Sequence, residues 1–368
     1  MRVLFDVTHP AHVHLFRHAI AILRAGDHDV RVTSRRKDLT TELLDAYDIA
    51  HVPLSTRGEG VVSLGAEWLA REARLFARGW RFGPDVVVSH LNPAAAHLAA
   101  LTGARGVVFN DQEVAGPVAR GTYPFVAVVC TPERFTQDLG SKHRRYRGFH
   151  ELAYLHPDRF TPRPDLLRAH GVAPNGRFFV CRFVSMDAHH DVGQEGISPA
   201  AKRRLVEYLA TKGTVFVSSE GNRGLEGVDG AAATPVPPSD VHHLLAFADL
   251  YVGDSGTMAT EAAVLGTPAL RCSSFVGPDD MSNFVELETE YGLLVNVADE
   301  SSLFSELHRL TDDLDATGWA WRERRCRLLA EKIDVTAFVV ETILGEGDPR
   351  RGERTEPATV GGRREDHE

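Results

Sequence analysis

Short runs of β-branched and aliphatic residues alternate with longer amphipathic stretches along the first half of the chain. In the amphipathic stretches apolar residues recur three or four positions apart, as at Leu15, Ala19 and Ile22, and this spacing is typical of helices. The short runs predict strands at 2–7, 29–34, 50–53, 85–89, 105–109 and 125–130. Strands that alternate with helices indicate a parallel sheet covered by helices, the Rossmann-like arrangement.

The periodic pattern stops at 156–175 and then starts again. Four prolines and several charged residues occupy this stretch, a composition that favours an extended connector over a core element. The second alternation predicts strands at 177–184, 214–219, 249–253 and 268–272, with helices at 239–248 and 257–265. The chain is therefore predicted to fold as α/β, with two Rossmann-like domains whose parallel sheets face each other across a cleft.

The domain boundaries follow from these patterns. We place the N-terminal domain at 1–155, the linker at 156–175 and the C-terminal domain at 176–344, whose last helix is a candidate to cross back over the junction. Residues 345–368 carry twelve charged residues among twenty-four, and Val360 is their only large aliphatic side chain. Such a segment cannot offset the entropy lost on ordering, so we expect a disordered tail.

Composition excludes several classes of protein. The 368 residues include 41 Lys and Arg against 51 Asp and Glu, a formal net charge of −10, which gives no overall attraction to nucleic acid or anionic membranes. The apolar runs are too short to span a bilayer, and no secretory signal precedes the first strand, so we expect a cytoplasmic protein. The four cysteines form no C-x-x-C pair and are predicted to be reduced, packed thiols.

Candidate chemistry is concentrated where the predicted strands end. Ligands of open α/β sheets lie beyond the carboxyl ends of the strands. In the first domain the candidate catalytic residues are His9, His12, Asp111 and Glu113. In the second domain the candidate ligand-binding residues are Arg182, Ser185, Asp187, His189, Asp254, Ser255, Gly256, Thr257 and Glu261.

Segment 251–268 is the most informative, because it predicts a strand, a tight turn and a helix in succession. The helix N-terminus presents free N–H groups, Gly256 lets a ligand approach the backbone, and Ser255 and Thr257 add hydroxyl donors, so a diphosphate fits. Glu261 lies one turn further along the same face, where a carboxylate can bind the diol of a ribose. The alternative is an ordinary helix cap followed by a glutamate on a solvated face.

This segment also carries a resemblance. From Asp254 to Pro268 it reads DSGTMATEAAVLGTP, which resembles the nucleotide-sugar signature of GT-B-fold glycosyltransferases and of the related non-hydrolysing UDP-N-acetylglucosamine 2-epimerases. The resemblance implies that Ser255 and Gly256 hold the diphosphate and that Glu261 holds the ribose.

Segments 6–14, 148–155, 240–245 and 283–288 extend the resemblance over nearly everything before the tail. Together they look like the mainly archaeal family called domain of unknown function 354, a group of predicted glycosyltransferases. The resemblance implies a GT-B pair of Rossmann-like domains with a nucleotide-sugar site, and it leaves the family's own reaction undefined.

The histidines after the first strand are candidate bases. An inverting transferase needs a group that accepts the proton of the acceptor hydroxyl, and histidine titrates near working pH, so we assign this role to His12 or His9. A metal site built from these two residues and His14 is the alternative. Alternate residues at a helix start diverge and no carboxylate is paired locally, so we predict no metal and assign His14 to the helix structure.

Other polar segments have competing interpretations. Asp111 and Glu113 either serve as base or acceptor ligands, or belong to an ordinary polar loop. The loop 185–191 is assigned to donor contact, with a general acid or a metal cluster as the alternatives. Arg182 is a candidate phosphate partner. Asp279 and Asp280 do not form D-x-D, the manganese signature of a different glycosyltransferase fold, so they imply no divalent ion. His242 and His243 are assigned to a capped surface helix, with a place for one of them in the base pocket as the alternative.

These observations predict a metal-independent GT-B-type glycosyltransferase without a cofactor, which moves a sugar from a nucleoside diphosphate, expected to be UDP, to an acceptor hydroxyl. A UDP-N-acetylglucosamine 2-epimerase is the first alternative. The epimerases that this chain resembles carry S-G-G-x-x-E-E and a His-Arg-Arg-Glu-Asn run, whereas this chain has Thr257 and Thr260 at the corresponding places and RFVSMD from Arg182. The second alternative is a nucleotide-sugar-binding protein without catalytic activity.

The acceptor and the oligomeric state stay open. A glycan or a lipid-linked acceptor fits, the latter with peripheral contact at the inner face of the membrane. The sequence offers no strongly basic amphipathic helix to argue for that contact, and no nucleic-acid partner is expected.

Overall fold

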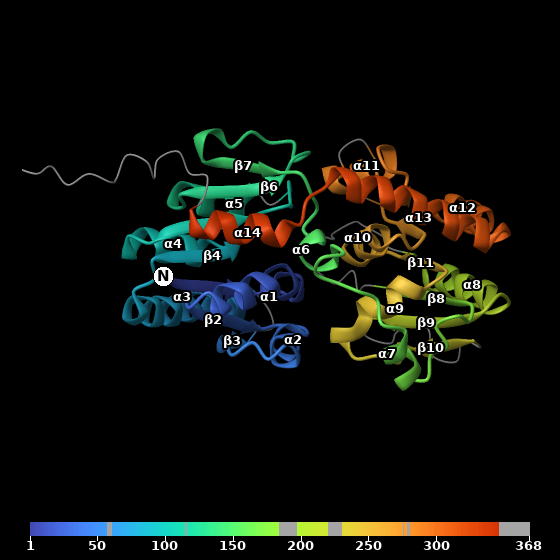
Figure 1. The fold of residues 1–368 in the computed structure, drawn as a ribbon, viewed down its shortest axis with the longest axis horizontal. Coiled ribbons are helices and arrows are strands. Elements are labelled where there is room, and N and C mark those ends of the chain that lie inside the picture. The colour runs from blue at the N-terminus through green and yellow to red at the C-terminus, as the bar shows by residue number, and fades with distance from the viewer. Residues whose placement is uncertain are drawn as a thin grey trace, which may run out of the picture.

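The computed structural model describes residues 1–56, 61–114, 116–183, 197–219, 230–274, 276–277 and 280–345, without the side chains of 61–64, 66 and 219. These residues form two lobes side by side along the long axis of the molecule, each built on one sheet (Figure 1). The two Rossmann-like domains predicted from the sequence are confirmed.

The sheet of the first lobe has the strand order β3-β2-β1-β4-β5-β6-β7 within the described residues, and all its pairs are parallel. Its strands are β1 (Arg2–Val7), β2 (Asp29–Arg36), β3 (Val52–Thr56), β4 (Val86–His90), β5 (Arg105–Phe109), β6 (Val128–Pro132) and β7 (His143–Tyr146). Its helices are α1 (Pro10–Ala25), α2 (Thr40–Ala46), α3 (Val61–Phe82), α4 (Pro93–Thr102) and α5 (Gly116–Thr122), with 3-10 turns at Tyr123–Phe125 and Gly140–Lys142. The strand order reverses between β1 and β4, which is where open α/β sheets bind ligands.

The second lobe repeats this plan with the parallel order β10-β9-β8-β11-β12-β13. Its strands are β8 (Phe178–Phe183), β9 (Thr214–Ser219), β10 (Ala231–Ala233), β11 (Leu250–Gly253), β12 (Ala269–Cys272) and β13 (Val295–Val297). Its helices are α8 (Pro199–Ala210), α9 (Val241–Phe247), α10 (Gly256–Leu265), α11 (Ser282–Thr289), α12 (Glu300–Asp312) and α13 (Leu314–Glu331), with a 3-10 turn at Pro238–Asp240. Here the order reverses between β8 and β11, so α10 begins at the second switch point.

Three further helices lie close to the two places where the chain passes between the lobes. Helix α6 (Leu152–Leu155) is buried, and α7 (Pro164–Ala169) interrupts the stretch that the sequence suggested is extended. Helix α14 (Val335–Leu344) packs against α1 and α6, among the helices of the first lobe (Figure 1). Arg105 fastens it there by donating from Nη1 to the carbonyl oxygen of Thr342 at 2.7 Å.

Each predicted strand is present, with ends shifted by a few residues, and β7, β10 and β13 were missed. The missed strands are only three or four residues long, too short for a period of two to be recognised. Residues 346–368 of the predicted tail lie outside the described residues. No described helix combines the length and the apolar character needed to cross a membrane.

The cysteine prediction is correct for three of the four side chains. Cys130, Cys181 and Cys272 are buried, whereas Cys326 is exposed on α13. Burial raises the pKa of the Cys130 and Cys181 thiols to about 12, so both are inert core residues. The prediction of a packed thiol is wrong for Cys326.

Candidate functional site

Two of the predicted histidines follow the end of β1, at the edge of the first sheet. His9 is the N-cap of α1, where its Nδ1 accepts a hydrogen bond from the Ala11 amide at 3.2 Å. His12 follows in the first turn and lies 3.4 Å from the Thr8 hydroxyl through Nδ1. Both line a cavity of about 480 Å³ between the start of α1, α3 and α4, so these two predicted residues lie together at one site.

Asp111 joins this edge through two histidines that the sequence analysis did not select. Its Oδ1 lies 3.0 Å from His90 Nε2 and its Oδ2 lies 3.0 Å from His150 Nδ1. The His90 ring stacks on His12 with centroids 4.3 Å apart. His150 Nε2 is buried and has no hydrogen-bond partner in the described part of the chain. We call His90, Asp111 and His150 the His–Asp–His cluster.

Burial and neighbouring charges set the protonation states here. Burial favours the neutral form of Asp111, but His150 and His90 outweigh it through charge and hydrogen bonds and hold the pKa of the carboxyl well below its usual range. Burial, followed by the nearby His90, lowers the pKa of His12 well below its ordinary value. Burial and the Lys37 charge lower the pKa of His9 to about 4. At neutral pH the site therefore combines an ionised Asp111 carboxylate with neutral imidazoles at His9 and His12.

These shifts predict that stability falls in acid. A histidine with a lowered pKa in the folded state stabilises the fold above its unfolded pKa of about 6.5, and loses that contribution as pH falls toward the folded pKa. With a folded pKa of about 4, His9 alone accounts for about 2 kcal/mol between pH 7.5 and pH 5. Urea unfolding at the two pH values measures the loss.

His9→Asn is the matched variant for this measurement, because asparagine keeps a good N-cap but does not titrate. The loss of unfolding free energy between pH 7.5 and pH 5 should be smaller in the variant by about 2 kcal/mol. An equal loss in both proteins would contradict the burial of neutral His9.

Among the residues that the structure describes, the His–Asp–His cluster is the grouping that could hold a metal ion. One ligand atom from each of His90, Asp111 and His150 lies within 4.8 Å of the other two, and imidazole with carboxylate suits a divalent transition metal. The alternative metal site of His9, His12 and His14 does not form. His14 turns away and stacks on Tyr154 at 5.1 Å. That no metal is used stays a prediction.

The second lobe presents the first turn of α10 to the same place. Ser255 is the N-cap of this helix, and its hydroxyl accepts from the Met258 amide at 3.4 Å, so the cap interpretation is correct for Ser255. Thr257 lines a smaller cavity of about 70 Å³ together with His12, His90 and Asp111. A helix N-terminus of one lobe and the histidines of the other therefore share one inter-lobe cavity.

Packing, as well as the predicted approach of a ligand, explains why glycine occupies position 256. A Cβ atom at this position would lie 2.6 Å from Phe284 Cζ on α11, closer than side-chain atoms approach. Any larger residue would require the buried Phe284 ring to shift, so packing favours glycine after the cap whether or not a ligand approaches the backbone. Phe284 in turn lies under the Arg271 guanidinium at 3.8 Å from its ring centroid.

Glu261 is not on a solvated face. Its side chain is 6% exposed, and its Oε1 accepts from the Tyr154 hydroxyl at 2.8 Å and lies 2.9 Å from His242 Nε2. Burial and the Glu261 charge raise the pKa of Tyr154 well above its ordinary value. His242 is buried, so its assignment to a surface helix is wrong. The carboxylate thus joins α10 to α6 and α9, next to His14 of the first lobe.

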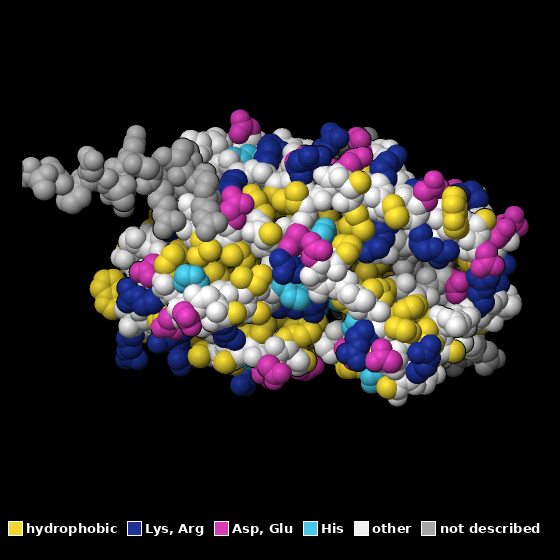
Figure 2. Space-filling model, viewed as in Figure 1, with side chains coloured by type: hydrophobic (Ala, Val, Ile, Leu, Met, Phe, Trp, Pro, Cys, Tyr) yellow, Lys and Arg dark blue, Asp and Glu magenta, His cyan; other side chains and the backbone are white. Residues whose placement is uncertain are grey.

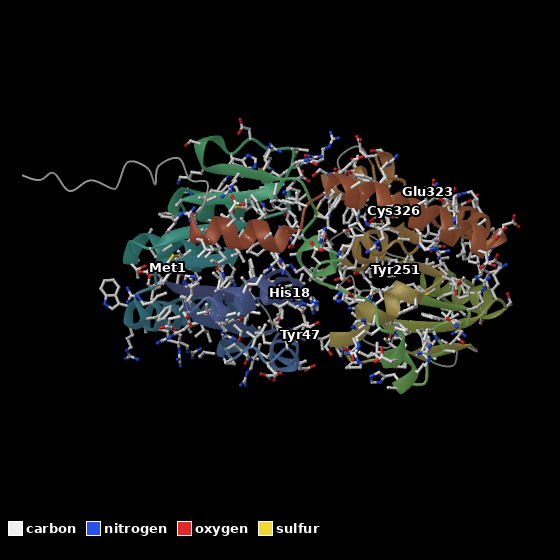
Figure 3. All side chains as sticks on the ribbon, viewed as in Figure 1. Met1, His18, Tyr47, Tyr251, Glu323 and Cys326 are labelled. Atoms are coloured by element: carbon white, nitrogen blue, oxygen red, sulfur yellow. The ribbon has the colours of Figure 1, made fainter. Side chains whose placement is uncertain are left out.

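Glu113 bridges the two lobes. Its Oε1 accepts from the Thr136 amide and its Oε2 from the Ser282 amide at the start of α11, both at 2.9 Å. Tyr47, labelled in Figure 3 on the side of the first lobe that faces the second, makes a second bridge by donating to the Ser239 carbonyl at 3.1 Å. The geometry gives Glu113 a lobe-joining role, and its predicted part as a base stays a prediction.

The remaining predicted residues lie along the edge of the second sheet. Arg182 donates to the Ser218 hydroxyl at 2.7 Å, and the buried Asp254 carboxylate lies 4.0 Å from Lys202 Nζ. Asp280 forms an ion pair with Arg271 at 2.6 Å. Four of the residues considered in the sequence analysis lie outside the described part of the chain: Ser185, Asp187, His189 and Asp279.

Sequence reasoning missed His90, His150 and Tyr154 as site residues, although signals existed. His90 is the last residue of β4, a strand-end position of the kind that was searched. His150 and Tyr154 lie in segment 148–155, which carried part of the family resemblance. Their contacts reach residues 21, 39 and 107 positions away in sequence, and such pairs leave no local pattern.

Solved structures with the same architecture are numerous. A UDP-GlcNAc 2-epimerase from Neisseria meningitidis bound to UDP-GlcNAc superimposes with a TM-score of 0.67 at 14% identity, over 94% of this chain and 100% of that chain. The S. aureus MnaA–UDP structure superimposes with a TM-score of 0.68 at 12% identity, over 98% of this chain and 100% of that chain. The glycosyltransferase VinC in complex with dTDP superimposes with a TM-score of 0.62 at 16% identity, over 94% of this chain and 100% of that chain. At these identities the likeness shows the GT-B fold.

Sequence comparison identifies the family. No curated protein matches the chain at a significant level. The family described as "Protein of unknown function (DUF354)" matches residues 1–313, which include both switch points and every described residue of the site. The chain is a member of the DUF354 family.

Proposed function

We propose that the protein is a nucleotide-sugar enzyme that transfers a sugar from a nucleoside diphosphate to an acceptor hydroxyl. The observation that carries the proposal is the shared inter-lobe cavity, lined by Thr257 of α10 and by His12, His90 and Asp111 of the first lobe. A helix N-terminus binds a diphosphate, and a buried histidine held by a carboxylate accepts a proton. Solved proteins of this fold bind UDP-GlcNAc, UDP or dTDP.

The donor would lie on the second lobe. The free amides of the first turn of α10, with the hydroxyls of Ser255 and Thr257, would stabilise the charge that develops on the leaving diphosphate. Glu261 would fix the ribose, directly or through the Tyr154 hydroxyl that it already accepts from. No metal is needed for this leaving-group stabilisation.

The acceptor would enter through the larger cavity of the first lobe. His9, His12 and His90 all line both cavities, and each is a candidate to accept the acceptor's proton. His90 is favoured because Asp111 fixes its Nε2, which leaves Nδ1 for the proton. The acceptor oxygen then bonds to the anomeric carbon, and the bond from that carbon to the diphosphate breaks with its electron pair.

The test is a panel of nucleotide sugars offered to the purified protein with EDTA present. Thermal shift measures binding and mass spectrometry follows the products. Stabilisation by one nucleoside-diphosphate sugar, with transfer once a hydroxyl acceptor is added, supports the proposal. The absence of binding to every donor and to UDP would contradict it, and a requirement for an added divalent ion would contradict metal independence.

A 2-epimerase is the second candidate, because the UDP-GlcNAc 2-epimerase from Neisseria meningitidis superimposes on this chain with a TM-score of 0.67, against 0.62 for the glycosyltransferase VinC. An epimerase works on the donor alone, so conversion of a UDP-sugar to its epimer without acceptor would favour this activity. Thr257 and Thr260, at positions where the epimerases that this chain resembles carry glycine and glutamate, favour transfer.

Glu261→Gln tests the ribose assignment. The amide keeps the size of the side chain but removes the charge that a ribose diol would donate to, so UDP affinity should weaken by about 1.5–3 kcal/mol, or roughly ten- to a hundredfold. Isothermal titration with UDP measures it. Glu288→Gln, on α11, is the control with a similarly engaged glutamate, which accepts from Asn296. Equal UDP affinity in a folded Glu261→Gln variant would remove the ribose role.

A further inference from the structure

Helix α3 (Val61–Phe82) carries an apolar stripe on its solvent face. Its buried side is the row Arg71, Leu75, Gly79 and Phe82, spaced four, four and three residues apart. The row Leu69, Ala73, Ala77 and Trp80 has the same spacing two positions earlier, so it lies on the opposite side of the helix. All four are exposed, with Leu69 at 73% and Trp80 at 70%.

Arginines border this stripe. Arg74, Arg78 and Arg81 form a third exposed row, one position beyond the apolar one. No carboxylate of the described residues lies within ion-pair distance of these three, and Arg74 donates to the Leu54 carbonyl. The two glutamates of the described part of α3 are used elsewhere, since Glu67 pairs with Arg35 and Glu72 with His97.

The charge of this face of α3 indicates which kind of surface would bind it. The whole chain carries a net charge of −10, so an uncompensated row of three cations on one helix is a local exception. A helix whose apolar stripe holds Trp and Leu and is bordered by arginines matches the pattern of helices that lie in the plane of a membrane interface. This corrects the sequence-based expectation that the chain has no such helix, because only the structure shows which face of α3 is exposed. Figure 2 shows apolar side chains at the left end of the molecule with Lys and Arg side chains below them, at the end where Figure 1 places α3.

We propose that the outer face of α3, defined by Leu69, Ala73, Ala77 and Trp80 with Arg74, Arg78 and Arg81, docks on an anionic phospholipid bilayer. The stripe from Leu69 to Trp80 extends about 16 Å along the helix. It meets the lipid at headgroup depth, while the buried row holds the helix on the sheet of the first lobe.

The helix that carries the stripe also forms part of the wall of the larger cavity. Trp68, Arg71 and Glu72, in the same helix, line that cavity, so its wall and the docking face belong to one element. If the proposed function holds, an acceptor carried on a lipid would reach the His–Asp–His cluster from this side. The docking itself does not depend on that function.

Co-sedimentation with vesicles tests the docking. The intact protein should sediment with vesicles of equal parts phosphatidylglycerol and phosphatidylcholine, bind pure phosphatidylcholine about tenfold or more weakly, and be released by high salt. The double variants Leu69→Gln/Trp80→Gln and Arg78→Gln/Arg81→Gln should each reduce the partition coefficient about tenfold or more.

The matched control is Trp319→Gln/Arg322→Gln, which removes an exposed tryptophan and an exposed arginine from α13 in the other lobe. It should bind vesicles as the unaltered protein does. Equal vesicle binding by all the variants would overturn the proposal. So would a dimer that Leu69→Gln/Trp80→Gln converts to a monomer without any vesicle binding, because the stripe would then be an interface between copies. UDP binding by the variants reports on the nucleotide site separately.

Discussion

Asp111→Asn is expected to lower the rate of sugar transfer about 10³- to 10⁴-fold while UDP affinity stays unchanged. Both oxygens of Asp111 face imidazole nitrogens, His90 Nε2 and His150 Nδ1, each at 3.0 Å. An asparagine offers one oxygen and one NH₂ group, so one of the two histidines must present an acceptor instead of a donor and change its tautomer. In a comparable His–carboxylate pair the loss of the correct tautomer costs about 10⁴-fold in rate.

The measurement is single-turnover transfer from the donor identified by the nucleotide-sugar panel, with UDP affinity measured in parallel. Asp45→Asn is the matched control, because Asp45 also lies against an imidazole, His51 Nε2 at 3.1 Å, but its side chain is 76% exposed and outside the cavities. The control should transfer sugar at the original rate. A folded Asp111→Asn protein with the original rate would show that the cluster does not move the proton.

The contrast between Asp111 and its histidines shows what the sequence can predict. Asp111 follows a five-residue buried strand, and the end of a parallel strand is a place where ligands bind, so position alone selected it. His150 lies after the short β7, whose residues His143–Tyr146 carry no apolar run. Its approach to Asp111 depends on how the chain turns between β7 and α6, and no local periodicity encodes that turn.

Glu261 shows the same limit for the second lobe. The spacing of four residues after Thr257 placed this carboxylate one turn further along α10, and its position in that helix is confirmed. Its contacts with Tyr154 and His242 arise because α6 and α9 pack against α10, and packing between lobes cannot be derived from the pattern of one helix. The fold class followed from the alternation of strands and helices, because that alternation is a local property repeated along the chain.

Arg71→Met is expected to destabilise the first lobe by about 3–5 kcal/mol. Asp6 is the penultimate residue of β1 and its side chain is fully buried. Arg71 Nη2 lies 2.6 Å and 2.8 Å from its two oxygens. Thr33 and Asn92 donate one hydrogen bond each, both at 2.6 Å, but they are neutral. Removing the guanidinium leaves a buried carboxylate without a countercharge, and breaking a buried pair from one side costs about that amount.

Chemical denaturation measures the loss, and two further variants determine its cause. Arg78→Met changes an exposed arginine of the same helix and should alter the unfolding free energy by no more than about 0.5 kcal/mol. Asp6→Asn combined with Arg71→Met removes both charges, and should recover much of the stability because a neutral amide needs no countercharge. If the double variant is as unstable as Arg71→Met alone, the loss reflects the packing of the arginine side chain rather than an unpaired carboxylate.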